Sequence, residues 1–288
     1  MRRATSWVTG VAVGAALLLG LVIVAGLQEA ISVPRERRLT ITLQDWPHGA
    51  PSLSIALLAD IHLGNRAMDA RRLTSIVGQV DAARPDMILI AGDFVVGNDA
   101  VGASELAGHL EGPLSELRAP LGVIAVFGNH DHWTAPAAIR AALTRAGATV
   151  LTKETMRRGP LAVMGIDDAF SGHDDIAAAI SSWSKVGGVP LVLTHTPDLV
   201  HRLPRNLPVV MAGHTHCGQI VLPLIGPPLA RSPKEHWRRL YDPRYRCGVI
   251  KYGGRTVVVT AGLGSGTTPI RIGAPPDWWL ISVGPARK

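Results

Sequence analysis

An apolar run leads directly into two polar side chains in the stretch Leu53-Ser54-Ile55-Ala56-Leu57-Leu58-Ala59-Asp60-Ile61-His62. Residues 53–59 have the length and composition of a buried β-strand. Asp60 and His62 follow at the end of that strand. They offer a carboxylate oxygen and an imidazole nitrogen, which are ligands for hard or borderline divalent cations. The stretch therefore predicts a strand that presents metal ligands at its carboxyl end.

The same arrangement recurs four more times along the chain. In each case a short apolar run precedes the polar residues, which are Gly92-Asp93, Gly128-Asn129-His130-Asp131, Thr194-His195 and Gly213-His214-Thr215-His216. One such piece alone is typical of a capped turn or a solvated loop. Because functional groups gather beyond the carboxyl ends of strands in open α/β sheets, five pieces in this order predict a single site that binds two metal ions.

Extended and helical segments alternate in the first half of the chain. After a first strand at 39–43, we expect strands at 53–59, 87–91 and 121–127 and helices at 69–83, 104–117 and 135–146. This order is typical of a parallel sheet covered on both faces. In the second half we expect a helix at 174–183 and strands at 161–166, 189–194, 209–212, 247–252, 256–260 and 278–283. We therefore predict one domain built around two packed sheets.

The N-terminal segment is apolar over a long stretch. Residues 7–27 carry no charged side chain and are long enough to cross the hydrocarbon layer of a membrane as a helix. No clear Ala-x-Ala cleavage site follows, so we expect a retained anchor, with a cleaved signal and a buried core helix as alternatives. Arg2 and Arg3 nearly balance Arg35, Arg37 and Arg38, which leaves the side of the membrane undecided.

The chain is basic, with a formal net charge of +7. A basic protein favours anionic partners, namely nucleic acid, phosphate-bearing substrates or acidic lipid headgroups. The sequence has no Lys/Arg block with interleaved aromatic residues, which weighs against nucleic acid. For a tethered domain we interpret the basic surface as facing phospholipid, although a generally basic soluble surface would carry the same charge.

Two cysteines, Cys217 and Cys247, are too few for a disulfide framework. They could pair outside the cytoplasm. Equally, Cys217 could be a small residue behind the preceding histidine pair. The sequence leaves both readings open.

The charge of the predicted site favours phosphate. Two divalent cations bring more positive charge than two carboxylate ligands remove, because His and Asn ligands are neutral. The filled site would therefore attract a phosphate anion and a hydroxide. Paired metals about 3.5–4 Å apart lower the pKa of a bridging water and stabilise the oxygens of an in-line displacement. These properties predict hydrolysis of phosphate esters.

Taken together, the five pieces resemble the calcineurin-like metallophosphoesterase superfamily, over about residues 50–285. The resemblance implies an α/β fold, a four-layer α/β/β/α sandwich of two mixed sheets, here preceded by one N-terminal transmembrane helix. The implied division is a membrane anchor at 1–30, a linker and first strand at 31–50, and a calcineurin-like phosphoesterase domain at 51–288.

The resemblance also implies roles for individual residues. One metal would be held by Asp60, His62, Asp93 and His216, and the second by Asp93, Asn129, His195 and His214. His130 would donate a hydrogen bond to the phosphoryl group or protonate the leaving oxygen, and Asp131 would orient His130. The implied cofactors are two divalent ions, for which Mn, Fe, Zn and Co all suit mixed nitrogen and oxygen ligands.

The sequence further resembles a membrane-anchored bacterial branch of the superfamily, through Cys217-Gly218-Gln219-Ile220, Gly262-Leu263-Gly264 and Pro269-Ile270-Arg271. The branch implies a single-pass protein of the inner cell membrane that hydrolyses a phosphodiester or pyrophosphate bond. UDP-2,3-diacylglucosamine of lipid A synthesis is one candidate lipid-linked substrate. The alternatives are an envelope or nucleotide phosphodiesterase outside the cytoplasm and a non-catalytic binding module, which the intact ligand set disfavours. Arg271 is expected either to contact phosphate or to form a surface salt bridge.

Overall fold

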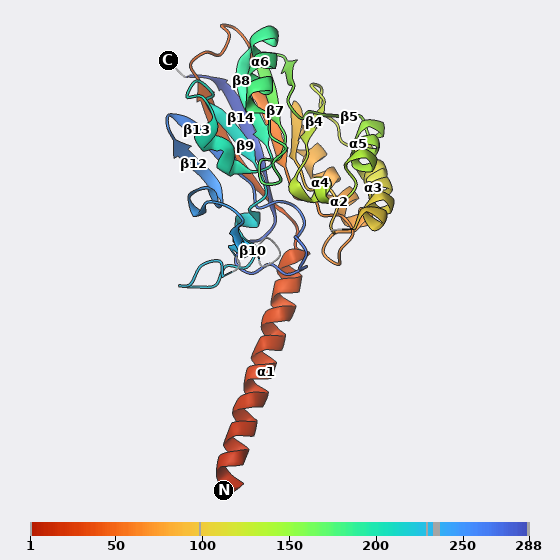
Figure 1. Ribbon diagram of the computed structural model, residues 1–288, viewed down its shortest axis with the longest axis vertical. Helices are drawn as coiled ribbons and strands as arrows, with labels where there is room; N and C mark the ends of the chain where they lie inside the picture. The colour runs from red at the N-terminus through yellow and green to blue at the C-terminus, as the bar shows by residue number, and fades with distance from the viewer. Residues whose placement is uncertain (1, 98, 229, 233–236, 287–288) are drawn as a thin grey trace.

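A single long helix stands clear of the folded body of the molecule (Figure 1). The computed structural model describes residues 2–97, 99–228, 230–232 and 237–286, and α1 (Arg2–Ala30) is its first element. Residues Gly10–Ala30 are long and apolar enough to cross a membrane. Within this stretch only Gly26 and Ala30, near the carboxyl end, are buried. The alternative of a buried core helix is therefore wrong.

Six strands form the first sheet, in the order β1-β14-β2-β3-β4-β5. Their bounds are Arg35–Leu43 (β1), Asp277–Pro285 (β14), Leu53–Leu58 (β2), Met87–Ala91 (β3), Val123–Val126 (β4) and Ala148–Val150 (β5). β14 is parallel to β1 and antiparallel to β2, whereas β2 to β5 are mutually parallel. Residues 35–38 were expected in a linker, but they belong to β1 because the pairing with β14 continues through them.

The second sheet also has six strands, in the order β12-β13-β9-β8-β7-β6. Their bounds are Gly248–Tyr252 (β12), Arg255–Val259 (β13), Val209–Ala212 (β9), Val189–Thr194 (β8), Leu161–Ile166 (β7) and Thr155–Arg158 (β6). The two edge strands are antiparallel to their neighbours and the inner four are parallel, so this sheet is mixed too. A small hairpin of β10 (Arg231–Ser232) and β11 (Arg238–Arg239) lies outside both sheets.

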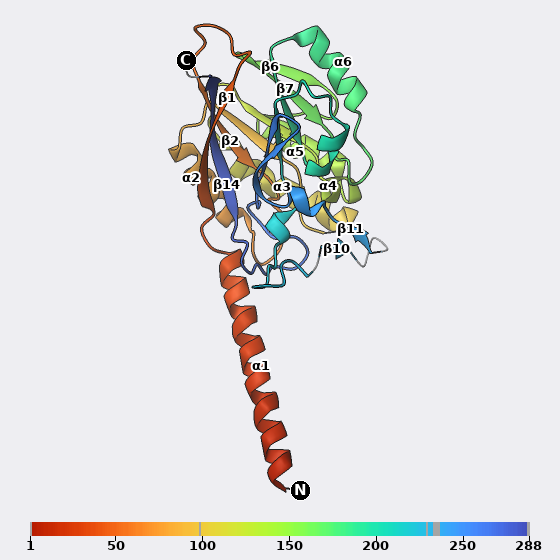
Figure 2. The ribbon, with the colours of Figure 1, turned by 90° about the vertical axis from the view of Figure 1, so that its left-hand side faces the viewer.

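Helices cover the outer face of each sheet (Figures 1 and 2). The first sheet is covered by α2 (Ala70–Ala82), α3 (Ala100–Ser115) and α5 (Pro136–Arg145). The second is covered by α6 (Ile176–Val186) and the 3-10 helix η1 (Pro197–Arg202). Among the described residues, short helical turns also occur at α4 (Asn129–Trp133), η2 (His216–Gly218) and η4 (Pro243–Tyr245). The predicted four-layer α/β/β/α sandwich of two mixed sheets is confirmed.

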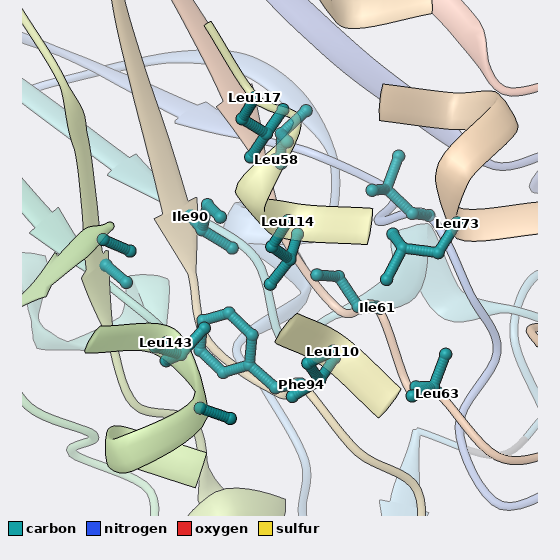
Figure 3. Close-up of a cluster of buried hydrophobic side chains, with 14 of the residues drawn as sticks. Leu58, Ile61, Leu63, Leu73, Ile90, Phe94, Leu110, Leu114, Leu117 and Leu143 are labelled. Carbon is teal, nitrogen blue, oxygen red and sulfur yellow. The ribbon is translucent and has the colours of Figure 1, made fainter. Parts of the chain in front are cut away.

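Side chains of the central strands alternate between two cores. Ile88 and Ile90 of β3 pack with the helices in the cluster that Figure 3 shows, whereas Met87 and Leu89 pack between the two sheets. Both faces of these strands are therefore buried. This explains why the sequence showed continuous apolar runs rather than an apolar–polar alternation.

The sheet order fixes where the strands end relative to α1. β1 begins shortly after α1 and is parallel to β14, and β14 is antiparallel to β2. The carboxyl ends of β2, β3 and β4 therefore lie at the end of the sheet where α1 joins the body, which we call the α1 end. The second sheet reaches the same end, because Thr260, just after β13, hydrogen-bonds through Oγ1 to the Asp277 carbonyl at the start of β14.

Candidate active site

Polar residues follow five strands that end at the α1 end of the domain. They are Asp60 after β2, Asp93 after β3, Asn129 after β4, His195 after β8 and His214 after β9. His62, His130, Asp131 and His216 follow one or two positions later in the same loops. The structure thus brings all nine residues singled out in the sequence to one region, where the loops of both sheets meet.

Two glycines allow these loops to approach closely. A Cβ atom at Gly128 would collide with the carboxylate of Asp93, and a Cβ atom at Gly213 would lie 2.6 Å from Oδ2 of Asp60. A residue with a side chain at either position would therefore displace a carboxylate of the site. The glycines of the sequence motifs are explained by packing against the neighbouring loop.

The first cluster consists of Asp60, His62, Asp93 and His216. The Nε2 atoms of His62 and His216 are 3.1 Å apart. Nε2 of His62 lies 3.4 Å from Oδ2 of Asp93, and Nε2 of His216 lies 3.5 Å from Oδ1 of Asp60. Ligand atoms of Asp60, His62 and His216 lie within 4.8 Å of one another, so these side chains could hold one ion.

The second cluster consists of Asp93, Asn129, His195 and His214. Nε2 of His195 is its centre and lies 3.3 Å from Oδ2 of Asp93, 3.2 Å from Oδ1 of Asn129 and 3.2 Å from Nδ1 of His214. Oδ2 of Asp93 faces both clusters, because it also lies beside His62.

Hydrogen bonds on the far side of two rings fix their tautomers. The Nδ1–H of His195 donates to the carbonyl of Ala91 at 2.6 Å, and the Nε2–H of His214 donates to the carbonyl of Leu240 at 2.8 Å. In the neutral rings the remaining nitrogens are lone-pair acceptors, and they face one another and the oxygens of Asp93 and Asn129. Acceptors that crowd together without a hydrogen between them are stabilised by a cation, so this arrangement fits a metal ion.

The backbone at these positions is strained. Left-handed φ angles occur at Asp60 (52°), His62 (47°), Asp93 (58°), His214 (69°) and His216 (49°). Such a conformation costs a non-glycine residue about 1–3 kcal/mol and persists where the surroundings enforce it, commonly at active sites and ligand clamps. Five of the seven residues whose side chains make the two clusters therefore have a strained backbone.

Burial and the charge of Asp93 control protonation in both clusters. Burial raises the pKa of Asp60 to about 8 and lowers the pKa of His62 to about 3 and of His214 to about 4. The latter two rings are therefore neutral at pH 7, which is the form that binds metals. Burial alone would lower the pKa of His195, but the negative charge of Asp93 outweighs it and holds this pKa well above its usual value. Without a metal, a proton on His195 reduces the repulsion between the acceptor atoms that crowd around it.

His130 and Asp131 differ from the expected pairing. Oδ1 of Asp131 accepts from the amide of Phe94 at 2.9 Å, and Oδ2 accepts from the amides of Asp93 (2.9 Å) and Gly128 (2.8 Å). The ring of His130 instead has its Nδ1 3.1 Å from the carbonyl of Gly97. Asp131 therefore holds the two loop backbones together, and the expectation that it orients the imidazole of His130 directly is corrected.

Arg271 is neither a surface residue nor exposed to an approaching phosphate. Its side chain is fully buried and donates to the carbonyls of Ala261 (2.7 Å) and Ala274 (2.9 Å), among others. Nη2 also lies 3.2 Å from Nδ1 of His216. The sequence predicted that Arg271 either contacts phosphate or forms a surface salt bridge, and both predictions are therefore wrong. Although burial lowers its pKa to about 10, it stays cationic at neutral pH and positions the loop that carries His216.

Sequence reasoning missed Phe170 and Arg238, which with Trp133 form an aromatic wall beside the site. The ring of Phe170 lies 4.9 Å from that of His214, and Trp133 lies 5.2 Å from His130 and 6.1 Å from Phe170, between ring centroids. The guanidinium of Arg238 stacks over Phe170 at 4.3 Å and donates to its carbonyl at 2.9 Å. One sequence signal pointed to this part of the site. Asp167 and Asp168 directly follow an apolar strand, β7, just as the cluster residues follow their strands.

Cys217 and Cys247 form a disulfide bond. Cys217 directly follows His216, and Cys247 directly precedes β12. The bond therefore ties the loop that carries a first-cluster histidine to the edge of the second sheet. Of the two readings that the sequence left open, the structure supports pairing.

Comparison with known proteins agrees with this architecture. A model of the calcineurin-like phosphoesterase family matches residues 53–218. The phosphodiesterase YaeI of Escherichia coli (strain K12) is 32% identical over 225 residues, which cover 75% of this chain and 77% of the relative. The uncharacterized metallophosphoesterase YkuE of Bacillus subtilis (strain 168) is 28% identical over 240 residues, covering 80% and 79%. A transmembrane protein with metallophosphoesterase domain of Danio rerio is 28% identical over 279 residues, covering 90% of this chain and 59% of the relative.

Proposed function

This chain belongs to the calcineurin-like phosphoesterase family, and we propose that it is a membrane-anchored, two-metal phosphodiesterase whose catalytic domain lies outside the cytoplasm. As a member of the family it is a metal-dependent hydrolase of phosphoric ester bonds. The observation that carries the proposal is the position of Asp93, whose Oδ2 lies 3.4 Å from Nε2 of His62 and 3.3 Å from Nε2 of His195.

The two clusters would each hold one divalent ion. We assign the first ion to Asp60, His62, Asp93 and His216, and the second to Asp93, Asn129, His195 and His214. Asp93 would contact both. The donors are carboxylate, amide and imidazole groups, a mixture that suits Mn, Fe, Zn or Co and does not discriminate among them.

The remaining chemistry divides between the ions and the protein. Bound ions would supply positive charge for the phosphoryl oxygens and activate a water. His130 would donate a hydrogen bond to the phosphoryl group or a proton to the leaving oxygen, since a ring nitrogen lies within 4.8 Å of the ligand atoms of His62 and Asp93. The carbonyl of Gly97 fixes the orientation of this ring. Asp131 keeps the loops that carry Asp93 and Asn129 together.

Three observations support a membrane anchor with the domain outside the cytoplasm. α1 is apolar along its length and exposed except near its carboxyl end, so residues 1–30 are taken as the anchor, with 31–50 leading into the domain at 51–288. The Danio rerio relative is named a transmembrane protein. The disulfide between Cys217 and Cys247 favours an oxidising compartment, because thiols stay reduced in the cytosol.

The side of the membrane bears on the substrate. A UDP-linked lipid precursor such as UDP-2,3-diacylglucosamine would be met on the cytoplasmic side, which the disulfide disfavours. We therefore favour a phosphodiester of the cell envelope over that precursor. The name of the Escherichia coli relative, a phosphodiesterase, points to the same bond type.

Two measurements test this proposal together. Alkaline phosphatase fused to the carboxyl terminus of the full chain should be active in a bacterial host, and green fluorescent protein fused there and exported unfolded should stay dark. The purified full chain should hydrolyse bis(p-nitrophenyl) phosphate when supplied with Mn, and Asp93→Asn should abolish that activity. Fluorescent fusions would place the domain in the cytoplasm, and no turnover with Mn, Fe, Zn or Co would contradict the enzymatic part.

A further inference from the structure

We propose that the α1 end of the domain lies against the membrane that holds α1, and that the enzyme hydrolyses a phosphodiester of a lipid within the headgroup layer. The contact surface, here named the membrane patch, comprises Leu224, Ile225, Arg231, Trp237 and Arg239. The proposal rests on the phosphodiesterase activity and the anchoring by α1 proposed above. It adds the orientation of the domain, the surface that contacts lipid and the class of substrate.

The sheet order places the site on the membrane side. β2, β3 and β4 run toward the end of the sheet at which α1 joins, so the loops with Asp60, Asp93 and Asn129 lie at that end. If α1 spans the bilayer, a site at the α1 end is close to the headgroups. A site at the opposite end of these strands would face away from the membrane.

The membrane patch exposes large apolar side chains that the folded body leaves uncovered. The exposed fraction is 109% for Leu224, 74% for Ile225 and 66% for Trp237. Leu224 (φ 66°) and Trp237 (φ 61°) also have left-handed backbone conformations, which are unusual for bulky residues. Water contact and backbone strain both disfavour these side chains at loop tips. Insertion into a lipid interface would compensate for both, because such interfaces bind exposed aromatic and aliphatic groups.

Hydrogen bonds connect the tip with Leu224 to α1. The carbonyl of Gly26 in α1 accepts from the amide of Arg271 at 3.0 Å. The next residue, Ile272, pairs with the chain at Val221, whose amide donates to its carbonyl at 2.7 Å. The turn then closes between Leu222 and Gly226. In Figures 1 and 2 the loop between β9 and β10 lies at the base of the domain, beside the point where α1 leaves it.

The charge of the membrane patch fits an anionic bilayer. Arg231 and Arg239 are exposed on the β10–β11 hairpin, and Arg35 is exposed just after α1. Basic residues close to a membrane surface are attracted by acidic lipids, and salt weakens this attraction. Apolar tips flanked by arginines are the composition of an interfacial membrane contact.

The β10–β11 hairpin also forms part of the active-site wall. Leu240, just after β11, accepts through its carbonyl from Nε2 of His214 at 2.8 Å. Arg238 on the same strand stacks over Phe170, whose ring contacts His214. One hairpin thus exposes Trp237 at its turn and supports a second-cluster histidine at its base. A headgroup phosphate at the interface would meet the site without the lipid leaving the bilayer.

The reaction that follows is hydrolysis of a diester. Water supplies a hydroxyl to phosphorus, one P–O bond to an alcohol oxygen breaks, and that oxygen takes the remaining proton. The products are a phosphomonoester and an alcohol, and no oxidant, reductant or further reactant is required. The acyl chains stay in the membrane throughout.

A depth measurement tests the contact directly. Full-length protein in phosphatidylcholine vesicles, with and without phosphatidylglycerol, is compared with Trp237→Phe for quenching of tryptophan fluorescence by brominated acyl chains. The difference between the two proteins reports Trp237 alone. We expect this difference signal to be quenched, and more strongly with phosphatidylglycerol. An unquenched difference signal in both vesicles would overturn the membrane contact.

A kinetic measurement tests the substrate class. The double variant Leu224→Ser with Ile225→Ser is assayed on phosphatidyl-p-nitrophenol in vesicles and on soluble bis(p-nitrophenyl) phosphate. We expect kcat/KM to fall by roughly tenfold on the lipid and to stay within about twofold on the soluble diester, since the patch raises the local concentration only at the surface. Tyr252→Ser removes an exposed aromatic ring at the opposite end of the second sheet and is the matched control, expected to spare both activities.

The outcomes distinguish the membrane patch from the anchored phosphodiesterase function on which it rests. Wild-type protein that does not float with vesicles would refute anchoring, and protein without turnover of the soluble diester would refute the phosphodiesterase; either result removes the present proposal as well. Protein that floats and is active, but whose double variant loses both activities equally or neither, would overturn the membrane patch alone. In that case the exposed tips would contact a protein partner or solvent.

Discussion

The carboxylate of Asp93 lies 3.3 Å from Nε2 of His195, although the two residues follow strands of different sheets. β3 of the first sheet ends just before Asp93, and β8 of the second ends just before His195. The two clusters therefore exist only when both sheets are packed together. Metal binding and folding of the whole sandwich should be coupled for this reason.

Asp93→Asn should cost more activity than Asp60→Asn. Asp93 faces His62 and His195 and so serves both clusters, whereas the imidazole nitrogen paired with Asp60, Nε2 of His216, belongs to the first cluster. We expect the Asp93 variant to lose both ions and the Asp60 variant to keep the second. Elemental analysis of each purified variant, alongside kcat, makes the comparison. Equal and small losses in the two variants would refute a shared carboxylate.

His130→Ala should retain both ions and turn over more slowly. The ring is assigned to the phosphoryl group or the leaving oxygen, and general acid help is typically worth about 10²–10⁴-fold. The loss should shrink for nitrophenyl esters, because nitrophenolate leaves without a proton. Activities on a nitrophenyl diester and on an alkyl diester are compared, together with metal content. A variant that binds fewer ions would mean that His130 is a ligand.

Metal uptake should release protons in a pH-dependent way. Burial raises the pKa of Asp60 to about 8, so this carboxyl is protonated at pH 7 in the metal-free protein and must ionise to bind. His195, whose pKa is also raised, must lose its proton too. Fewer protons should appear above pH 8 than at pH 7. Calorimetric titration with Mn in buffers of different ionisation enthalpy counts them, and Asp60→Asn is the control. A proton count that does not change with pH would contradict this account.

Replacing Cys217 and Cys247 together by Ser should lower the free energy of unfolding by about 2–4 kcal/mol, since the disulfide closes a loop of 30 residues. The affinity of the first cluster should fall more than that of the second, because Cys217 adjoins His216. Urea unfolding and metal titration of the variant and of reduced wild-type protein measure both effects. Unchanged stability in the variant would show that the bond constrains nothing.

The sequence predicted those parts of the fold that depend on local pattern. β2, β3, β4, β8 and β9 were visible because burial on both faces makes a strand continuously apolar. The short edge strands β5 and β6 were not, since β6 is Thr-Met-Arg-Arg and carries no such signal. The helical turn α4 was hidden for another reason, because it begins at Asn129 within the metal-ligand motif.

The candidate site, like the fold, was predictable where it depends on local sequence and not where it depends on contacts between distant segments. Each candidate ligand could be named because it stands beside a strand end. Arg271 was misjudged because arginine is seldom fully buried, and here the carbonyls of Ala261, Gly264 and Ala274 accept its hydrogen bonds. The contact of Arg238 with Phe170 joins positions 68 residues apart, which no local pattern reports.

A crystal structure of the full chain loaded with Mn, with anomalous differences collected at the manganese edge, would locate the bound ions. We expect two peaks about 3.5–4 Å apart, as in two-metal phosphatases, with Asp93 contacting both. His62 and His216 should contact one ion, and His195 and His214 the other. A single peak, or two peaks of which only one touches Asp93, would refute a two-metal site that shares the carboxylate of Asp93.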